Sequence, residues 1–200
     1  MLDFKESKII LLVFVVSGIA FWSMYFLIPK PHIPNIPMPW EATKTNNIVQ
    51  VFGLKMGHST LKNAMQIFGT EAEVALFKGK NKDNTIEVYF KGTKIGGLSI
   101  SAILALELDE RDLIMLNQNI ENHEVLPSGN EKVEFNYFAL NQLIDKKIKN
   151  LSFIPRASLS EKVILQRFGE PQIKTKTNWI YPNQGLNIVR DGELSIFEYK

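Results

Sequence analysis

Residues 159–181, LSEKVILQRFGEPQIKTKTNWIY, contain the clearest structural pattern in the chain. Ser158 or Ser160 is suited to cap the N-terminus of a helix, because a serine hydroxyl accepts a hydrogen bond from the first free amides. Gly169 supplies a C-terminal stop, and Pro171 prevents the helix from continuing. The pattern predicts a capped helix, a turn and two short strands.

The same plan occurs earlier, in residues 59–90. There STLKNAMQIFG is followed by a turn and by the alternating segment TIEVYF. Lys62, Gln66 and Phe68-Gly69 match the residues found 100 positions later. We therefore expect one structural unit used twice.

The segments around these two units predict further elements. Asp109 is suited to cap a helix over DERDLIMLNQNI, since acidic residues favour the first turn of a helix. Residues 123–130 are expected to form a loop and residues 138–148 a second helix. Arg190–Glu193, RDGE, is typical of a two-residue β-hairpin turn.

The N-terminal part contains an uncharged run, Ile9–Ile28, IILLVFVVSGIAFWSMYFLI. A helix of that length is about 30 Å long, the thickness of a bilayer's hydrocarbon core, which predicts an uncleaved transmembrane helix. A signal peptide cleaved near Gly18-Ile19-Ala20 is the alternative. Lys5 and Lys8 precede the run and Lys30 alone follows it closely. This excess predicts a short cytoplasmic tail over residues 1–8 and a domain on the other side.

Five of the nine prolines lie in residues 29–39, PKPHIPNIPMP. Alternating prolines favour extended polyproline II, so residues 29–47 are expected to be a linker. A stalk is the simpler interpretation, and a docking site for a partner that reads PxxP segments is the alternative.

Together these patterns predict an α+β protein with an N-terminal transmembrane helix and two helix-on-antiparallel-sheet repeats. The expected domain covers residues 48–200, with repeat one at about 48–108 and repeat two at about 131–200. The expected location is a bacterial inner membrane, crossed once, with the C-terminal domain in the periplasm.

Composition excludes several classes of function. The chain has no cysteine, which removes disulfides, thiolate metal sites and lipidated cysteine anchors. Its net charge is only +2, so nucleic acid is not expected as a partner. His32, His58 and His123 are far apart in the sequence and form no metal-ligand motif. No catalytic residue, metal or cofactor is predicted, although an enzyme that uses scattered carboxylates stays an alternative.

Aromatic residues are the best candidates for a binding surface. Trp179 and Tyr181 share one face of a predicted strand, as do Phe197 and Tyr199, and Tyr89 lies on the matching strand of repeat one. Such rings most often lie in a core. If instead the second face of the sheet is open, they would form an aromatic partner-binding patch.

Phe168-Gly169-Glu170-Pro171, Trp179-Ile180-Tyr181 and the Asp191-Gly192 hairpin resemble the SmpA/OmlA (BamE-like) module. Tandem copies of this kind are also similar to the β-lactamase inhibitor protein, in which two helix-on-sheet repeats present a concave sheet to a partner. Repeat one departs from the pattern, with Val88-Tyr89-Phe90 in place of W-x-Y. The resemblance implies a fold and a tendency to bind proteins.

We therefore expect a membrane-anchored, non-catalytic protein-interaction or scaffolding module with a protein partner in the cell envelope. The alternative is an inhibitor or regulator of an envelope enzyme that acts through the open sheet face.

Overall fold

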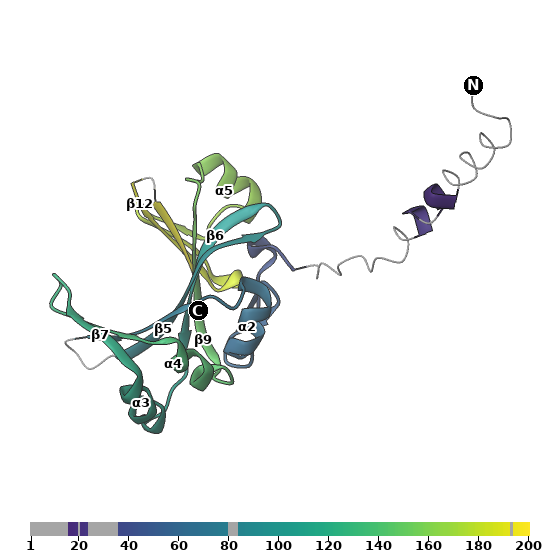
Figure 1. Cartoon of the computed structure of the whole chain (residues 1–200). Coiled ribbons are helices and arrows are strands. Elements are labelled where there is room, and N and C mark those ends of the chain that lie inside the picture. The colour runs from purple at the N-terminus through teal and green to yellow at the C-terminus, as the bar shows by residue number, and fades with distance from the viewer. Residues whose placement is uncertain (1–15, 20, 24–35, 80–83, 193) are drawn as a thin grey trace, which may run out of the picture. The chain divides into compact units, whose positions relative to one another are not determined.

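The computed structural model describes residues 16–19, 21–23, 36–79, 84–192 and 194–200. It divides into two units, Met1–Asn35 and Ile36–Lys200, which are treated separately. In the first unit, residues 16–19 and 21–23 are helical. All the elements named below belong to the second unit (Figure 1).

Within the described residues, ten antiparallel strands form one continuous sheet, here called the main sheet. From one edge to the other its strands are β10 (Ile173–Lys174), β11 (Asn178–Tyr181), β12 (Leu186–Asp191), β13 (Leu194–Tyr199), β9 (Ile148–Pro155), β6 (Leu98–Leu106), β5 (Asn84–Ile95), β4 (Glu73–Lys78), β8 (Glu131–Phe135) and β7 (Ile120–Val125).

The remaining elements gather on one side of the main sheet (Figure 1). A small sheet is formed by β1 (Thr43–Thr45), β2 (Ile48–Val51) and β3 (Leu54–Lys55). The α-helices are α2 (Leu61–Phe68), α3 (Glu110–Leu116), α4 (Tyr137–Leu143) and α5 (Glu161–Phe168), and the 3-10 turns are η1 (Pro39–Glu41), η2 (Asn117–Asn119) and η3 (Pro182–Gln184).

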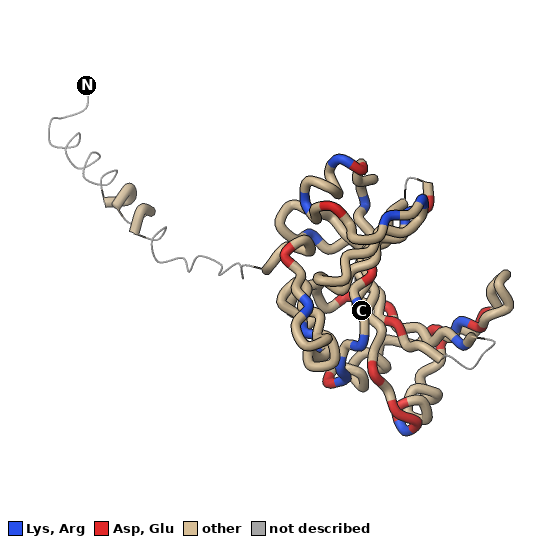
Figure 2. The backbone as a smooth tube through the Cα atoms, turned by 180° about the vertical axis from the view of Figure 1, so that it is seen from behind, with Lys and Arg blue, Asp and Glu red and all other residues tan. Residues whose placement is uncertain are grey.

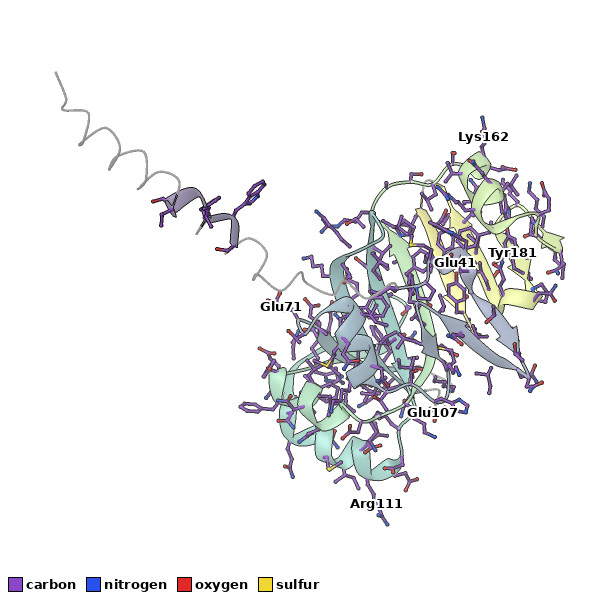
Figure 3. The ribbon with its side chains drawn as sticks, turned by 90° about the vertical axis from the view of Figure 1, so that its right-hand side faces the viewer. Glu41, Glu71, Glu107, Arg111, Lys162 and Tyr181 are labelled. Carbon is purple, nitrogen blue, oxygen red and sulfur yellow. The ribbon has the colours of Figure 1, made fainter. Side chains whose placement is uncertain are left out.

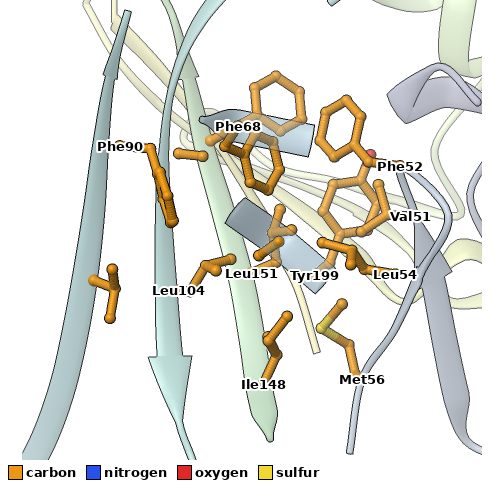
Figure 4. Packing of buried hydrophobic residues seen from close by; sticks show 14 of the residues in the cluster. Val51, Phe52, Leu54, Met56, Phe68, Phe90, Leu104, Ile148, Leu151 and Tyr199 are labelled. Carbon is orange, nitrogen blue, oxygen red and sulfur yellow. The ribbon is translucent and has the colours of Figure 1, made fainter. Parts of the chain in front are cut away.

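A single hydrophobic core lies between the main sheet and this layer (Figure 4). Alternate strand residues point into it, as the two-residue period of a strand requires. In β5 these are Ile86, Val88 and Phe90, all buried, whereas the residues between them are only half-buried. Phe68 of α2 packs 5.5 Å from Phe90, and Phe52, beside the small sheet, packs 5.6 Å from Phe153 of β9.

The two repeat helices are confirmed at the predicted positions. α2 and α5 both end at phenylalanine, and the glycine that follows has φ of 100° at Gly69 and 79° at Gly169. Each helix end is also held by a hydroxyl from the main sheet. Thr93 Oγ1 donates to the carbonyl of Phe68 at 2.8 Å, and Tyr181 Oη donates to the carbonyl of Gly169 at 3.1 Å.

The predicted α+β arrangement of two helix-on-antiparallel-sheet repeats is wrong, because most of the regular structure in the second unit is strand and one ten-stranded sheet runs through both halves. The two halves share one sheet, because β9 pairs with β6 of repeat one on one side and with β13 of repeat two on the other. β9 lies within the expected second repeat, after β8 and α4, so repeat two supplies the strand that joins the halves. The small sheet is a further addition that the repeat pattern does not contain.

The predicted transmembrane helix over Ile9–Ile28 is also corrected. No helix among the described residues is long and apolar enough to cross a membrane. Only residues 16–19 and 21–23 of the run are described. The predicted tail over residues 1–8 and the first part of the proline segment also lie outside the described residues. The expected linker over 29–47 is too long at its C-terminal end, because the second unit begins at Ile36 and Pro39 is buried.

The segment after α3 differs from prediction as well. The expected helix over residues 109–120 ends at Leu116, and the expected loop after His123 is in part a strand, β7. Every residue of β7 is exposed, so the segment lacks the alternation of buried residues by which a strand is recognised.

Candidate functional site

Of the five aromatic residues predicted to form a binding patch, Trp179, Tyr181, Phe197 and Tyr199 are buried in the core. Figure 3 shows Tyr181 within the strands beneath α5, on which Lys162 points outward. Phe197 stacks on Phe153 at 4.6 Å. The patch is therefore not formed, because these rings occupy the covered face of the main sheet.

The contacts of Trp179 show what this cluster does. Lys174 Nζ lies 4.4 Å from the centre of its ring and the Arg190 guanidinium 4.9 Å. Lys174 also pairs with Glu161 at 2.6 Å, and this contact holds the pKa of the Glu161 carboxyl below its usual value. Glu161 is the first residue of α5, so the cluster fixes that helix to the strands.

Tyr89 is the exception among the five. Its neighbours Val88 and Phe90 point into the core, so Tyr89 lies on the opposite face of β5, half-buried. Its hydroxyl donates to Ser101 Oγ at 3.1 Å. It is paired across the strands with Glu73 of β4 and Ile103 of β6.

That opposite face, here called the open face, is bordered by the start of α4 near Tyr137, and no described helix lies across it (Figure 1). The exposed faces of antiparallel sheets are usually polar. The open face is instead rich in half-buried apolar side chains on successive strands, namely Phe77, Tyr89, Ile103, Ile154, Ile196, Val189 and Ile180.

One part of the open face is hollowed. The hollow has a volume of about 710 Å³ and is here called the Glu87 hollow. Its lining includes Ala75, Phe77, Glu87, Tyr89, Ile103, Lys132, Glu134 and Tyr137.

Side-chain size explains the hollow. Glu87 is paired across the strands with Ala75 on β4 and with Ala105 on β6, and Ala75 is paired in turn with Glu134 on β8. Ala75, which lines the hollow, keeps its floor low beside Glu87, and Ala105 places no large side chain on the other side of Glu87. Phe77 lies two residues after Ala75 on β4, and Tyr89 lies two residues after Glu87 on β5, on the same face. Their large side chains form the walls of the hollow.

Glu87 is the least usual group in the hollow. Burial raises the pKa of its carboxyl. No described side chain donates a hydrogen bond to it or forms an ion pair with it. Such a carboxylate is destabilised relative to one in water, and a cation placed beside it would restore the lost stabilisation.

Two other charges of the hollow, those of Lys132 and Glu134, are paired with each other. Lys132 Nζ donates to Glu134, a contact that raises the pKa of the lysine and lowers the pKa of the glutamate. Asn122 Nδ2 also donates to Glu134, at 3.2 Å. Lys132 is therefore held away from Glu87 by a strong hydrogen bond on β8 itself.

Exposed aromatic side chains lie beside the hollow, at the start of α4. Tyr137 lines it and is 70% exposed, and its neighbour Phe138 is 68% exposed. Tyr137 therefore extends the apolar surface of the hollow onto the start of α4.

The structure places the histidines singly. Nδ1 of His58 lies 3.2 Å from the carbonyl of Met56, and Nε2 of His123 lies 3.2 Å from Glu131. His32 lies outside the described residues. In the described part of the chain no group of three His, Cys, Asp or Glu side chains could hold a metal ion.

Comparison with known proteins gives no relative: no family model, no curated protein and no solved structure matches this chain. The resemblance to the BamE-like module therefore stays a prediction from the residues quoted above.

Sequence reasoning selected the covered face of the main sheet for four of the five aromatic residues, and only Tyr89 lies on the open face. The alternation in TIEVYF assigns Ile86, Val88 and Phe90 to one face and Glu87 and Tyr89 to the other. That signal could have placed Glu87 on the open face. It could not have revealed the hollow, because Ala75 and Ala105 come from other strands and meet Glu87 only through the pairing register.

Proposed function

We propose that this chain is a non-catalytic protein-binding module whose partner docks on the open face of the main sheet. The observation that carries the proposal is the row of half-buried apolar side chains on a sheet face that no described helix covers. Contiguous apolar surface rimmed by polar groups is typical of protein interaction sites. The face also curves as a shallow concave surface, which suits a convex partner (Figure 1).

The resemblance to tandem BamE-like repeats supports the same proposal, since the related inhibitor presents a concave sheet to its partner. An inhibitor or regulator of an enzyme would use the same face, so one experiment serves both versions. The extracytoplasmic side was predicted from charges that flank residues 9–28, and it stays a prediction.

The experiment is site-specific photo-cross-linking in cells that express the chain. A photoreactive phenylalanine analogue replaces Ile103 or Ile154 on the open face, and Val163 on α5 is the matched control. Val163 is also apolar and is 39% exposed, but it lies on the covering layer. We expect the same adduct from both open-face positions and none from Val163. Adducts that are identical at all three positions, or absent from the open face in a folded chain, would exclude this function.

A further inference from the structure

The Glu87 hollow differs from the rest of the open face in its electrostatics. On the other half of the sheet, Glu198 accepts hydrogen bonds from Asn187 Nδ2 at 3.2 Å and from Lys200 Nζ at 3.1 Å. Glu87 has no such donor among the described residues. Glu198 and Glu87 lie on the same face of the main sheet, but only Glu198 already has a positive partner, Lys200.

The charges around the hollow do not balance. Its lining holds the carboxylates of Glu73, Glu87, Glu121 and Glu134 and the ammonium of Lys132. Lys132 is paired with Glu134 and is also close enough to Glu73 to interact with its charge, so one cation faces four carboxylates in the lining. Figure 2 shows acidic segments along the strands at this end of the sheet. The field in the hollow therefore attracts positive charge.

We propose that the Glu87 hollow receives a lysine or arginine side chain from an otherwise apolar segment of the partner protein, with Glu87 as its counter-ion. This inference rests on the proposed function and assigns the chemistry of the partner at one place on the open face.

The shape of the hollow supports a protein segment as the occupant. A volume of about 710 Å³ exceeds the space needed for one side chain and lies within the range of about 300–1,000 Å³ typical of ligand sites. Ile103, Phe77 and the exposed ring of Tyr137 line it beside the carboxylate. A basic side chain would pair with Glu87, and apolar side chains on either side of it would pack on the apolar residues that line the hollow. A free inorganic cation would use only the carboxylate.

The test uses phage-displayed random peptides selected on the full chain. We expect the enriched peptides to contain one lysine or arginine between apolar residues. Synthetic copies of the best peptide should bind Glu87→Gln about tenfold more weakly than the unchanged chain, a loss typical of one charge-assisted hydrogen bond. Replacing the peptide's basic residue with glutamine should cause a similar loss.

Two variants complete the design. Glu198→Gln makes the same substitution on the same face, where the carboxylate already has partners, and should leave binding unchanged. Ala75→Trp fills the hollow from its floor and should abolish enrichment of basic peptides. Three results would overturn the inference. The enriched peptides would lack a basic residue, or the best peptide would bind Glu87→Gln as tightly as the unchanged chain. In the third, basic peptides would be enriched no more on the unchanged chain than on Ala75→Trp. If the cross-links from Ile103 persist in any of these cases, the proposed function stands and only the chemistry assigned to the hollow is wrong.

Discussion

Gly185 and Gly192 have the same left-handed backbone, with φ of 60° at each, but different surroundings. A Cβ at Gly185 would lie 2.3 Å from Val49 Cγ2 and 2.9 Å from the carbonyl oxygen of Lys200, whereas a Cβ at Gly192 meets no atom within 4 Å. We predict that Gly192→Ala lowers the free energy of unfolding by about 1 kcal/mol, the cost of a left-handed alanine. Gly185→Ala should cost about 1–3 kcal/mol more, from overpacking.

Urea denaturation of both variants measures the difference. Since the backbone cost is shared, the difference isolates the close packing of Gly185 against Val49 and against the backbone of Lys200. Equal losses in the two variants would mean that both neighbours move aside freely.

Tyr181 allows a prediction about pH. Burial, with the negative charge of Glu170 as a smaller cause, raises its pKa to about 12, against about 10 for an unfolded tyrosine. Folding therefore favours the protonated phenol. Its contribution to stability is complete below pH 10 and is lost as the pH rises through about 12.

Tyr181→Phe should lower the free energy of unfolding at neutral pH by about 1 kcal/mol, because the carbonyl of Gly169 loses its donor. Above pH 10 the gap between the variant and the unchanged chain should narrow. Denaturation curves collected from pH 7 to pH 11 check this, with Tyr137→Phe as the control for removal of an exposed hydroxyl. A gap that widens with pH would contradict the sign of the effect.

For single residues, the sequence predicted local features well and contacts between distant strands poorly. Gly69 and Gly169 were recognisable as helix ends because the signal lies in one short segment. The burial of Trp179 and the isolation of Glu87 depend on strands brought together by register, so the sequence could not show them.

Among the elements, α3 depends on one buried charge. Asp112 is 3% exposed, closes the first turn of α3 by accepting a hydrogen bond from the amide of Asp109, and pairs with Lys146 Nζ at 2.6 Å. Lys146 lies in the segment between α4 and β9, so this ion pair joins α3 to the rest of the domain.

We predict that Lys146→Met lowers the free energy of unfolding by about 1–3 kcal/mol, because it leaves a buried carboxylate without its cation. Lys147→Met is the matched control. The side chain of Lys147 is next to Lys146 in the sequence, but it is exposed and forms no ion pair with a described residue. Thermal denaturation of the two variants checks the prediction. A loss in Lys147→Met as large as that in Lys146→Met would show that removal of any local positive charge has the same effect.

Elements with a strong apolar pattern were predicted close to their observed bounds, and β7 was not. Leu61, Ala64 and Phe68 of α2 recur at helical spacing and are all buried. β7 is held by its pairing with β8 alone and buries no side chain, so only the tertiary fold defines it.

For the whole domain, one sheet and one core connect the two repeats. We predict that Ile86 in repeat one and Ile188 in repeat two report the same urea midpoint, because the strands between them are continuous and neither half closes its own sheet. Methyl NMR of the two isoleucines through the transition measures this. Separate midpoints would mean that the halves unfold independently and that the shared sheet does not couple them.

The prediction for the whole domain failed because the repeat pattern contains no information about how the two repeats are joined. The duplicated segments show that α2 and α5 are alike, but they do not show which strand lies between them. β9 takes that place because its apolar residues, Leu151 and Phe153, complete the same core from the middle of the sheet.

The position of β13 has a consequence for synthesis. Of the strands described, β13 leaves the ribosome last, yet it lies in the interior of the main sheet, between β12 and β9. Its Tyr199 hydroxyl donates to the carbonyl of Pro39 at 2.7 Å, and so ties down the first part of the domain to be made. β12 is joined to β13 by a short turn, so the two strands leave the ribosome together. Until this hairpin is available, one edge of β9 has no partner and is open to pairing with other chains. The nascent domain therefore carries an unprotected strand edge through most of its synthesis.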